Sequence, residues 1–236
     1  MTDTLTNPAL RICAALAGLL LLAPAPALAG PRRADLRGAA DVAKVDTAKP
    51  ERTRVQVVQS LNPAGRDPSL SPALAAQALE SVPLDAAKVK DPVAVFDIDD
   101  TTISTTTHLA APGAVAYANQ LIAAGVKVLF LTGRPERKRA FTIDQLQSLG
   151  FPVDAQHTLL VMNPKDGPPE PFKPAAKPTL EKAGTPIAFF DNEKNELQMF
   201  SQQYPSAQVF ELNTVSASSY KGARPPSIQV INNFDE

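Results

Sequence analysis

Cysteine is almost absent from this chain of 236 residues, and neither sign of charge is in large excess. The one cysteine, Cys13, lies in a segment that we predict is removed. The mature chain is therefore expected to have no disulfide, no thiolate metal site and no cysteine nucleophile. The 23 basic and 24 acidic residues give a net charge of −1, and no basic stripe runs along the sequence. This charge pattern argues against nucleic acid as a partner, because such binding depends on concentrated positive charge.

The first 29 residues are predicted to be a secretory signal peptide. Arg11 precedes an apolar run from Ile12 to Ala23, which is short for a transmembrane helix. Ala27-Leu28-Ala29 then forms a small-residue cleavage site, and Gly30 offers no lipid attachment point. We expect cleavage after Ala29, a periplasmic or secreted location, and no membrane attachment of the mature chain.

Two further regions follow the predicted cleavage site. Residues 30–65 are expected to form a flexible arm rich in proline and alanine, with one short strand at residues 55–58. Residues 66–236 are expected to form the main domain, which begins with a helical extension. Ser71 is a suitable N-cap for a helix over residues 73–80, Pro83 is expected to stop it, and a short second helix is expected over residues 85–89.

The central stretch of the chain is an apolar run, Val93 to Phe96, that leads directly into Asp97, Asp99 and Asp100. The run predicts a buried parallel strand, and the carboxyl end of such a strand is where open α/β sheets bind ligands. The carboxylates of Asp97 and Asp99, two positions apart, repel each other unless one is protonated or a cation lies between them. Magnesium is the favoured cation for oxygen ligands. An acidic surface turn is the alternative interpretation, but it does not account for the apolar run.

Strands and helices are predicted to alternate after this point. The strands are expected over residues 126–131, 158–162, 187–190 and 208–212, and the helices over residues 112–124, 135–150 and 193–203, the second with Ala140, Ile143, Leu146 and Leu149 on one face. This order predicts a Rossmann-like α/β fold with three layers, α/β/α, and a mostly parallel sheet. The segments between strands are too short for a large inserted cap.

Polar residues stand at the ends of three of these strands: Asp97 with Asp99, then Thr132, then Asp191. Right-handed crossovers bring the carboxyl ends of parallel strands to one edge of the sheet, so these side chains are expected to share one cleft. Taken singly, Thr132 and Asp191 could equally be helix caps.

The motifs resemble those of the haloacid dehalogenase (HAD) superfamily. Phe96-Asp97-Ile98-Asp99-Asp100-Thr101 resembles its first motif, and Phe130-Leu131-Thr132-Gly133-Arg134 its second. Phe189-Phe190-Asp191, followed by Asn195 or Glu196, resembles its fourth. Within the superfamily the chain is most similar to secreted acid phosphatases of classes B and C.

The resemblance implies a magnesium-dependent phosphomonoester hydrolase that works through an aspartyl-phosphate. Asp97 would be the nucleophile, Asp99 the acid and base, and Thr132 a hydrogen-bond donor to phosphate. Asp97, Asp191 and the backbone carbonyl of Asp99 would hold Mg²⁺. A 5′-nucleotidase, a polynucleotide phosphatase and a non-catalytic binding or storage protein on the same fold remain alternatives.

The third and fourth motifs leave choices open. Lys173 is favoured as the third-motif lysine, with Lys177 as its rival. In the fourth motif, Asn195 and Glu196 stand where the family commonly has a second aspartate, so either could support the metal.

Arg134 and the two histidines of the chain are the remaining residues considered for contact with substrate. Arg134 could contact a substrate anion or pair with a nearby acid such as Glu136. His108 could touch substrate, although an exposed bystander is the favoured interpretation, and His157 is expected to have no role.

The site is expected to be fairly open, because only the loop over residues 163–171 and the N-terminal helices could cover it. The predicted partner is a phosphorylated substrate, either a small molecule or an exposed phosphate on a larger one.

Overall fold

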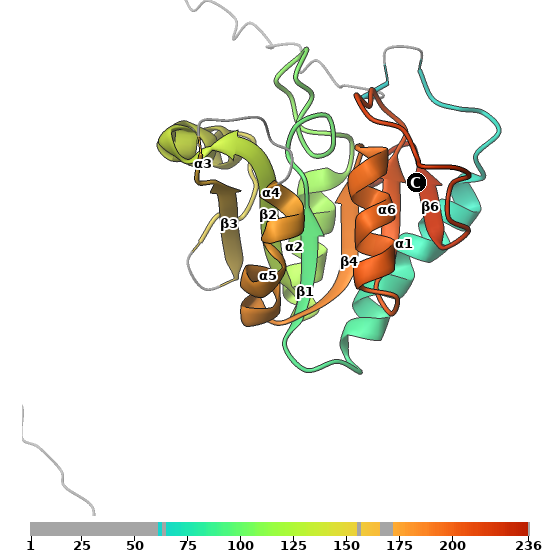
Figure 1. Ribbon diagram of the computed structural model, residues 1–236, viewed down its shortest axis with the longest axis horizontal. Coiled ribbons are helices and arrows are strands. Elements are labelled where there is room, and N and C mark those ends of the chain that lie inside the picture. The colour runs from blue at the N-terminus through green and yellow to red at the C-terminus, as the bar shows by residue number, and fades with distance from the viewer. Residues whose placement is uncertain (1–60, 63–64, 155–156, 166–171, 236) are drawn as a thin grey trace, which may run out of the picture. The chain divides into compact units, whose positions relative to one another are not determined.

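Figure 1 shows a computed structural model of the chain, which describes residues 61–62, 65–154, 157–165 and 172–235. The described residues belong to one compact unit. The predicted signal peptide, nearly all of the predicted arm with its short strand, and residues 166–171 of the predicted covering loop lie outside them. Among the described residues, no helix combines the length and the apolar character that a membrane crossing needs.

A sheet of six strands forms the middle of the fold, and its strand order is β3-β2-β1-β4-β5-β6. All neighbouring strands pair in parallel. The strands are β1 (Pro92–Phe96), β2 (Lys127–Pro135), β3 (Thr158–Asn163), β4 (Thr185–Asp191), β5 (Gln208–Leu212) and β6 (Ile228–Ile231). This order is that of the doubly wound α/β fold, with β1 inside the sheet, so the predicted fold class is confirmed.

Helices cover both faces of the sheet (Figure 1). The helical elements are α1 (Pro72–Ala86), α2 (Ala114–Ala123), the 3₁₀ turn η1 (Glu136–Lys138), α3 (Arg139–Ser148), α4 (Phe172–Ala175), α5 (Lys177–Ala183) and α6 (Lys194–Gln203). Buried residues of α1, α2 and α3 pack on one face, and those of α5 and α6 pack on the other. The described residues between the strands contain no inserted cap domain, as expected.

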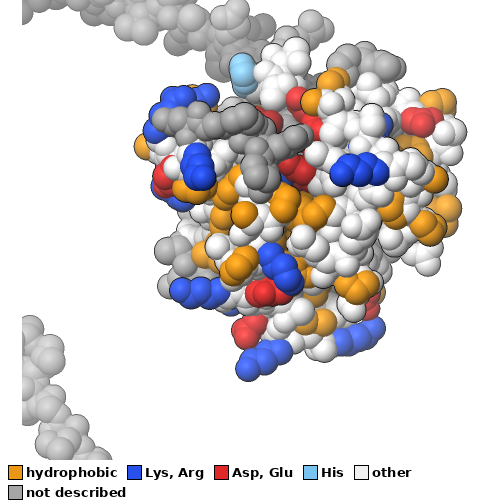
Figure 2. Space-filling model, in the orientation of Figure 1, with side chains coloured by type: hydrophobic (Ala, Val, Ile, Leu, Met, Phe, Trp, Pro, Cys, Tyr) orange, Lys and Arg blue, Asp and Glu red, His pale blue; other side chains and the backbone are white. Residues whose placement is uncertain are grey.

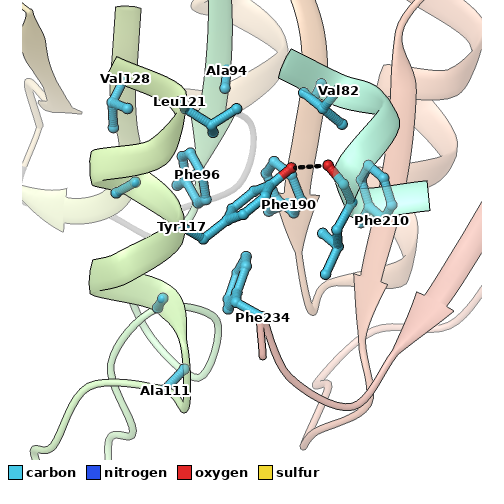
Figure 3. Packing of buried hydrophobic residues seen from close by; sticks show 14 of the residues in the cluster. Val82, Ala94, Phe96, Ala111, Tyr117, Leu121, Val128, Phe190, Phe210 and Phe234 are labelled. Carbon is cyan, nitrogen blue, oxygen red and sulfur yellow. Dashed lines mark hydrogen bonds between the residues drawn. The ribbon is translucent and has the colours of Figure 1, made fainter. Parts of the chain in front are cut away.

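A row of four phenylalanines crosses the sheet directly below the strand ends. Phe130, Phe96, Phe190 and Phe210 are partners in the strand register, and all are buried on the face that carries α1 and α2. Phe190 stacks on Phe96 with ring centroids 4.5 Å apart and on Phe210 with centroids 4.7 Å apart. Tyr117 and Phe234 close over the row (Figure 3). In β1 and β4 the row lies one residue before Asp97 and Asp191, whereas β2 continues past Phe130 to Pro135.

The prediction that Pro83 ends the first helix is wrong, because α1 continues through Pro83 to Ala86. Proline has no N–H, so the carbonyl of Leu79, four residues earlier, loses its helical donor. The hydroxyl of Tyr117 donates to this carbonyl at 2.9 Å (Figure 3). Tertiary contact therefore satisfies the acceptor that the proline leaves. The second predicted helix does not form separately, because α1 ends at Ala86 and residues 87–89 are not helical.

Three other expectations about the elements need correction. Strand β2 does not end at Leu131 but runs on to Pro135, with an irregular register between Thr132 and Pro135. Helix α3 buries Thr142 and Leu146, whereas Ala140 of the predicted apolar face is exposed. Strand β6 was not predicted. Gly125 follows α2 in the left-handed conformation, with φ of 82°.

Candidate active site

Asp97 and Asp191 occupy the carboxyl ends of two neighbouring strands. Asp97 follows β1 directly, and its backbone N–H donates to the carbonyl of Phe190 at 2.9 Å. Asp191 is the last residue of β4. The parallel register therefore brings the two carboxylates to the same edge of the sheet, as the sequence predicts.

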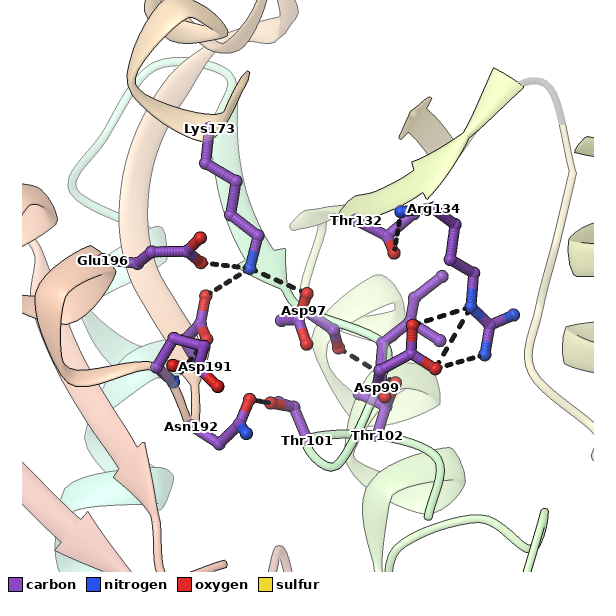
Figure 4. Close-up of polar contacts among 12 residues, drawn as sticks. Asp97, Asp99, Thr101, Thr102, Thr132, Arg134, Lys173, Asp191, Asn192 and Glu196 are labelled. Carbon is purple, nitrogen blue, oxygen red and sulfur yellow. Dashed lines mark hydrogen bonds and ion pairs between the residues drawn. The ribbon is translucent and has the colours of Figure 1, made fainter. Parts of the chain in front are cut away.

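The ammonium group of Lys173 lies between three carboxylates (Figure 4). It donates to Asp97 Oδ1 at 2.8 Å and to Asp191 Oδ2 at 2.7 Å, and it contacts Glu196 of α6. Only 4% of the Lys173 side chain is exposed, and Asp97 and Asp191 are similarly buried. The carboxylate cluster, defined here as Asp97, Asp191 and Glu196, thus surrounds one buried cation.

The rival lysine lies elsewhere. Lys177 pairs with Glu181 one turn further along α5, and its ammonium group lies 4.8 Å from the centre of the Tyr204 ring. The structure thus places Lys173, rather than Lys177, beside the predicted nucleophile. Of the two fourth-motif candidates, Glu196 is the one that reaches the cluster.

Burial controls the ionisation of the cluster. Burial raises the pKa of Asp97 to about 7, opposed by the positive charge of Lys173 and assisted by the negative charge of Asp191. Burial likewise raises the pKa of Glu196 to about 9, with Asp191 adding to the effect. Burial alone would lower the pKa of Lys173, but Asp191, Asp97 and Glu196 together hold it well above its usual value. One ammonium group does not offset three ionised carboxylates in a buried site, and protonation of Asp97 or Glu196 reduces this imbalance.

Asp99 points to a different partner from Asp97. Its carboxylate accepts from Arg134 Nε at 2.9 Å and from Arg134 Nη2 at 2.7 Å, a two-point ion pair (Figure 4). Arg134 therefore pairs with an acid, but the acid is Asp99 rather than Glu136, which pairs with Arg139. This ion pair was not predicted from the sequence, because it depends on β2 continuing past Thr132.

Three threonine hydroxyl groups organise the backbone around the two motifs. Thr132 is fully buried and its Oγ1 accepts from the backbone N–H of Arg134 at 3.2 Å. Thr101 donates to Asn192 Oδ1 at 3.1 Å, and Thr102 donates to the carbonyl of Asp97 at 3.0 Å. Thr101 thereby joins the first motif to the residue after Asp191, and Thr102 fixes the turn that carries Asp97. Neither role was predicted from the sequence.

Asp191 also holds the turn that precedes α6. Its Oδ1 accepts from the backbone N–H of Glu193 at 2.9 Å, just before α6 begins, while its Oδ2 accepts from Lys173. The N-cap of α6 is Glu193, so the interpretation of Asp191 as a helix cap is wrong and its carboxylate belongs to the cluster.

A cleft of about 480 Å³ is lined by Asp97, Asp99 and Lys173 among others, whereas Thr132 and Asp191 lie behind its lining. The charged side chains of its lining are Asp97, Asp99, Asp100, Glu193 and Glu196 against Arg134, Lys138 and Lys173. Five carboxylates and three cations leave a formal excess of two negative charges. His108 lies outside this lining. On the face drawn in Figure 2, basic side chains stand among acidic and uncharged ones and form no stripe.

Residues 106–212 match the family described as HAD superfamily, subfamily IIIB (acid phosphatase). The match confirms the predicted resemblance to HAD-superfamily acid phosphatases. With it, the prediction that the chain is a phosphatase is confirmed. The matched range includes Thr132, Lys173, Asp191 and Glu196, and it begins after Asp97 and Asp99.

Two solved structures are similar to this chain. One is the class C acid phosphatase from Bacillus anthracis with tungstate bound, at 18% identity and a TM-score of 0.46, covering 64% of this chain and 84% of that one. The other is the class C acid phosphatase from Bacillus anthracis, at 19% identity and a TM-score of 0.44, covering 66% of this chain and 86% of that one. None of the curated proteins matches the chain.

HAD-family phosphatases generally use a divalent metal, usually Mg²⁺. Within the described residues, no three histidine, cysteine, aspartate or glutamate side chains converge as a ready-made metal cage. Magnesium does not need one, since it commonly binds through one or two carboxylates and completes its shell with water and phosphate oxygens. The buried Oε2 of Glu196 contacts the ammonium group of Lys173. The all-oxygen donor set and the formal excess of negative charge fit a divalent cation.

Proposed function

We propose that this protein is a magnesium-dependent phosphomonoester hydrolase in which Asp97 forms an aspartyl-phosphate. One observation carries the proposal: Asp97, Asp191 and Glu196 converge on Lys173 at the carboxyl ends of β1 and β4, in a cleft with excess negative charge. A phosphate dianion would be repelled from such a cleft unless a divalent cation entered as well.

The side chains of Asp97 and Asp191, with the backbone carbonyl of Asp99, would hold Mg²⁺. The bound metal would neutralise phosphate charge as a Lewis acid. Lys173 would stabilise further negative charge on the transferring group, because its ammonium lies 2.8 Å from the attacking carboxylate. Thr132 accepts the Arg134 N–H, which leaves its own O–H available as a donor to phosphate.

The reaction would proceed in two steps. Asp97 Oδ attacks phosphorus, the bond from phosphorus to the leaving oxygen breaks, and Asp99 supplies the proton to that oxygen. Water then attacks the aspartyl-phosphate while Asp99 takes its proton, and inorganic phosphate leaves. Both steps depend mainly on placement and charge neutralisation, which is the chemistry that this cleft offers.

The decisive experiment is turnover of p-nitrophenyl phosphate by Asp97→Asn. We expect activity to fall at least about 10³-fold, because an amide is a far weaker nucleophile than a carboxylate. Asp144→Asn on the exposed side of α3 is the matched control and should retain full activity. A folded Asp97→Asn protein with normal turnover would remove Asp97 from this role, and full activity of the native protein in EDTA would remove the metal.

The cellular location is a separate part of the proposal. Residues 1–29 have the features of a cleavable signal peptide, and class B and C acid phosphatases are often secreted or periplasmic. We propose the same location here, with a phosphorylated small molecule as the substrate. Determining the amino-terminal residue of protein purified from the periplasm or the culture medium tests it, and an intact Met1 would contradict it.

A further inference from the structure

The side chain of Asp99 is anchored by a single residue in the part of the chain that the structure describes. All of the hydrogen bonds to its carboxylate there come from Arg134, through Nε and Nη2. Asp99 lies beyond the end of β1 and 40% of its side chain is exposed, so the strand does not fix its rotamer. The orientation of Asp99 therefore depends on the orientation of Arg134.

Arg134 is itself held from a helix outside the cleft. Its Nη1 donates to Gln145 Oε1 at 2.8 Å and lies 3.4 Å from Thr142 Oγ1, both on α3. Only 12% of the Arg134 side chain is exposed. One edge of the planar guanidinium group faces Asp99 and the other faces α3, so both ends of the group are fixed.

We propose that Gln145 and Arg134 form a positioning relay that holds the Asp99 carboxylate for the hydrolysis of the aspartyl-phosphate. The proposal rests on the proposed function of Asp99 and adds two residues that act through it. Arg134 touches the acid–base group, and Gln145 acts only through Arg134.

The geometry favours the second step of the reaction over the first. A carboxylate that accepts from arginine on both oxygens is oriented as an acceptor, which suits removal of a proton from water. In that step the water oxygen bonds to phosphorus, its proton moves to Asp99, and the bond from phosphorus to Asp97 breaks. To protonate a leaving group in the first step, Asp99 must release one of its two bonds to Arg134.

This assignment predicts an unequal effect on kcat and kcat/KM in Gln145→Leu. A displaced base slows hydrolysis of the aspartyl-phosphate, and misplacement of a catalytic group by about 1 Å can cost about 10²-fold in rate. We expect kcat for p-nitrophenyl phosphate to fall about tenfold while kcat/KM stays within about twofold, because only the later step slows. Rapid mixing should reveal a burst of p-nitrophenol close to one equivalent of enzyme.

Two variants separate positioning from simple damage to the fold. Gln145→Glu keeps an acceptor oxygen for Arg134 and should retain kcat within about twofold. Gln147→Leu changes an exposed residue of the same helix and should behave like the native protein. Thermal unfolding of each variant shows whether the fold is intact.

Each outcome bears on one claim. Equal losses of kcat and kcat/KM in Gln145→Leu, without a burst, would overturn the relay, as would unchanged kinetics. Full activity of Asp99→Asn would instead overturn the proposed role of Asp99, whatever Gln145→Leu does. Arg134→Lys, which cannot make the two-point pair, should show the same burst with a larger loss of kcat.

Discussion

At the scale of single residues, the site is dominated by the imbalance around Lys173. Three carboxylates contact one ammonium group, and all four side chains are almost completely buried. Removing one partner of a buried ion pair leaves an uncompensated charge, which costs about 3–5 kcal/mol. Lys173 is therefore required for the stability of this edge of the sheet as well as for the proposed chemistry.

Lys173→Met should lower the free energy of unfolding by about 3–5 kcal/mol, because it leaves the carboxylate cluster without a counter-charge. It should also abolish phosphatase activity. Urea unfolding measured by circular dichroism, beside a p-nitrophenyl phosphate assay, checks both effects. Lys177→Met is the control and should change neither, because its partner Glu181 is exposed to solvent. Equal behaviour of the two variants would mean that the cluster does not depend on Lys173.

At the scale of secondary-structure elements, α1 depends on a contact from α2. Pro83 deprives the Leu79 carbonyl of a helical donor, and the Tyr117 hydroxyl replaces it. A buried carbonyl without a partner costs about 1–3 kcal/mol. The continuity of α1 is thus a property of the α1–α2 pair.

Tyr117→Phe should lower the free energy of unfolding by about 1–3 kcal/mol. In a Pro83→Ala background the new backbone N–H can reach the Leu79 carbonyl, so the same substitution should cost about 1 kcal/mol less. A double-mutant cycle by chemical denaturation measures this difference. The same cost in both backgrounds would show that Tyr117 does not replace the missing helical donor.

The elements also show what the sequence could predict. The apolar runs that become β1, β2, β4 and β5 are clear because most of their residues are buried on both faces of the sheet, and strand ends converge in any parallel sheet. Strand β6 was missed because Ile228–Ile231 is short and follows a proline-rich stretch. The Asp99–Arg134 pair and the Tyr117 contact were missed because both join residues that are distant in sequence through side-chain geometry.

At the scale of the whole molecule, the buried carboxylates link stability to pH and to metal. The pKa values of Asp97 and Glu196 in the folded protein are about 7 and about 9, above their ordinary values of 3.8 and 4.5. At pH values between the ordinary pKa and the raised pKa of each group, the folded chain binds more protons than the unfolded chain. Stability from this source is therefore greatest below pH 4 and falls as pH rises through 7 and towards 9.

In EDTA, the melting temperature should accordingly fall as pH rises from 5 to 8 if these two groups dominate, and Mg²⁺ should raise it more at pH 8 than at pH 5. Metal binds the ionised carboxylates, so it removes the penalty only where they are ionised. Differential scanning fluorimetry over this range checks the prediction, with Asp97→Asn as the variant that should respond less to Mg²⁺. A Mg²⁺ effect that is independent of pH would contradict it.

The row of phenylalanines affects the electric field of the aspartates that follow it. Phe96 and Phe190 are each followed at once by an aspartate, so hydrocarbon gives way to charge within one residue along two adjacent strands. The layer of aromatic rings has a much lower dielectric constant than water. The electric field of a charge at the boundary between the two is therefore concentrated on the side of the solvent. The stacked rings would therefore direct the attraction of the aspartates outward, towards an arriving ion.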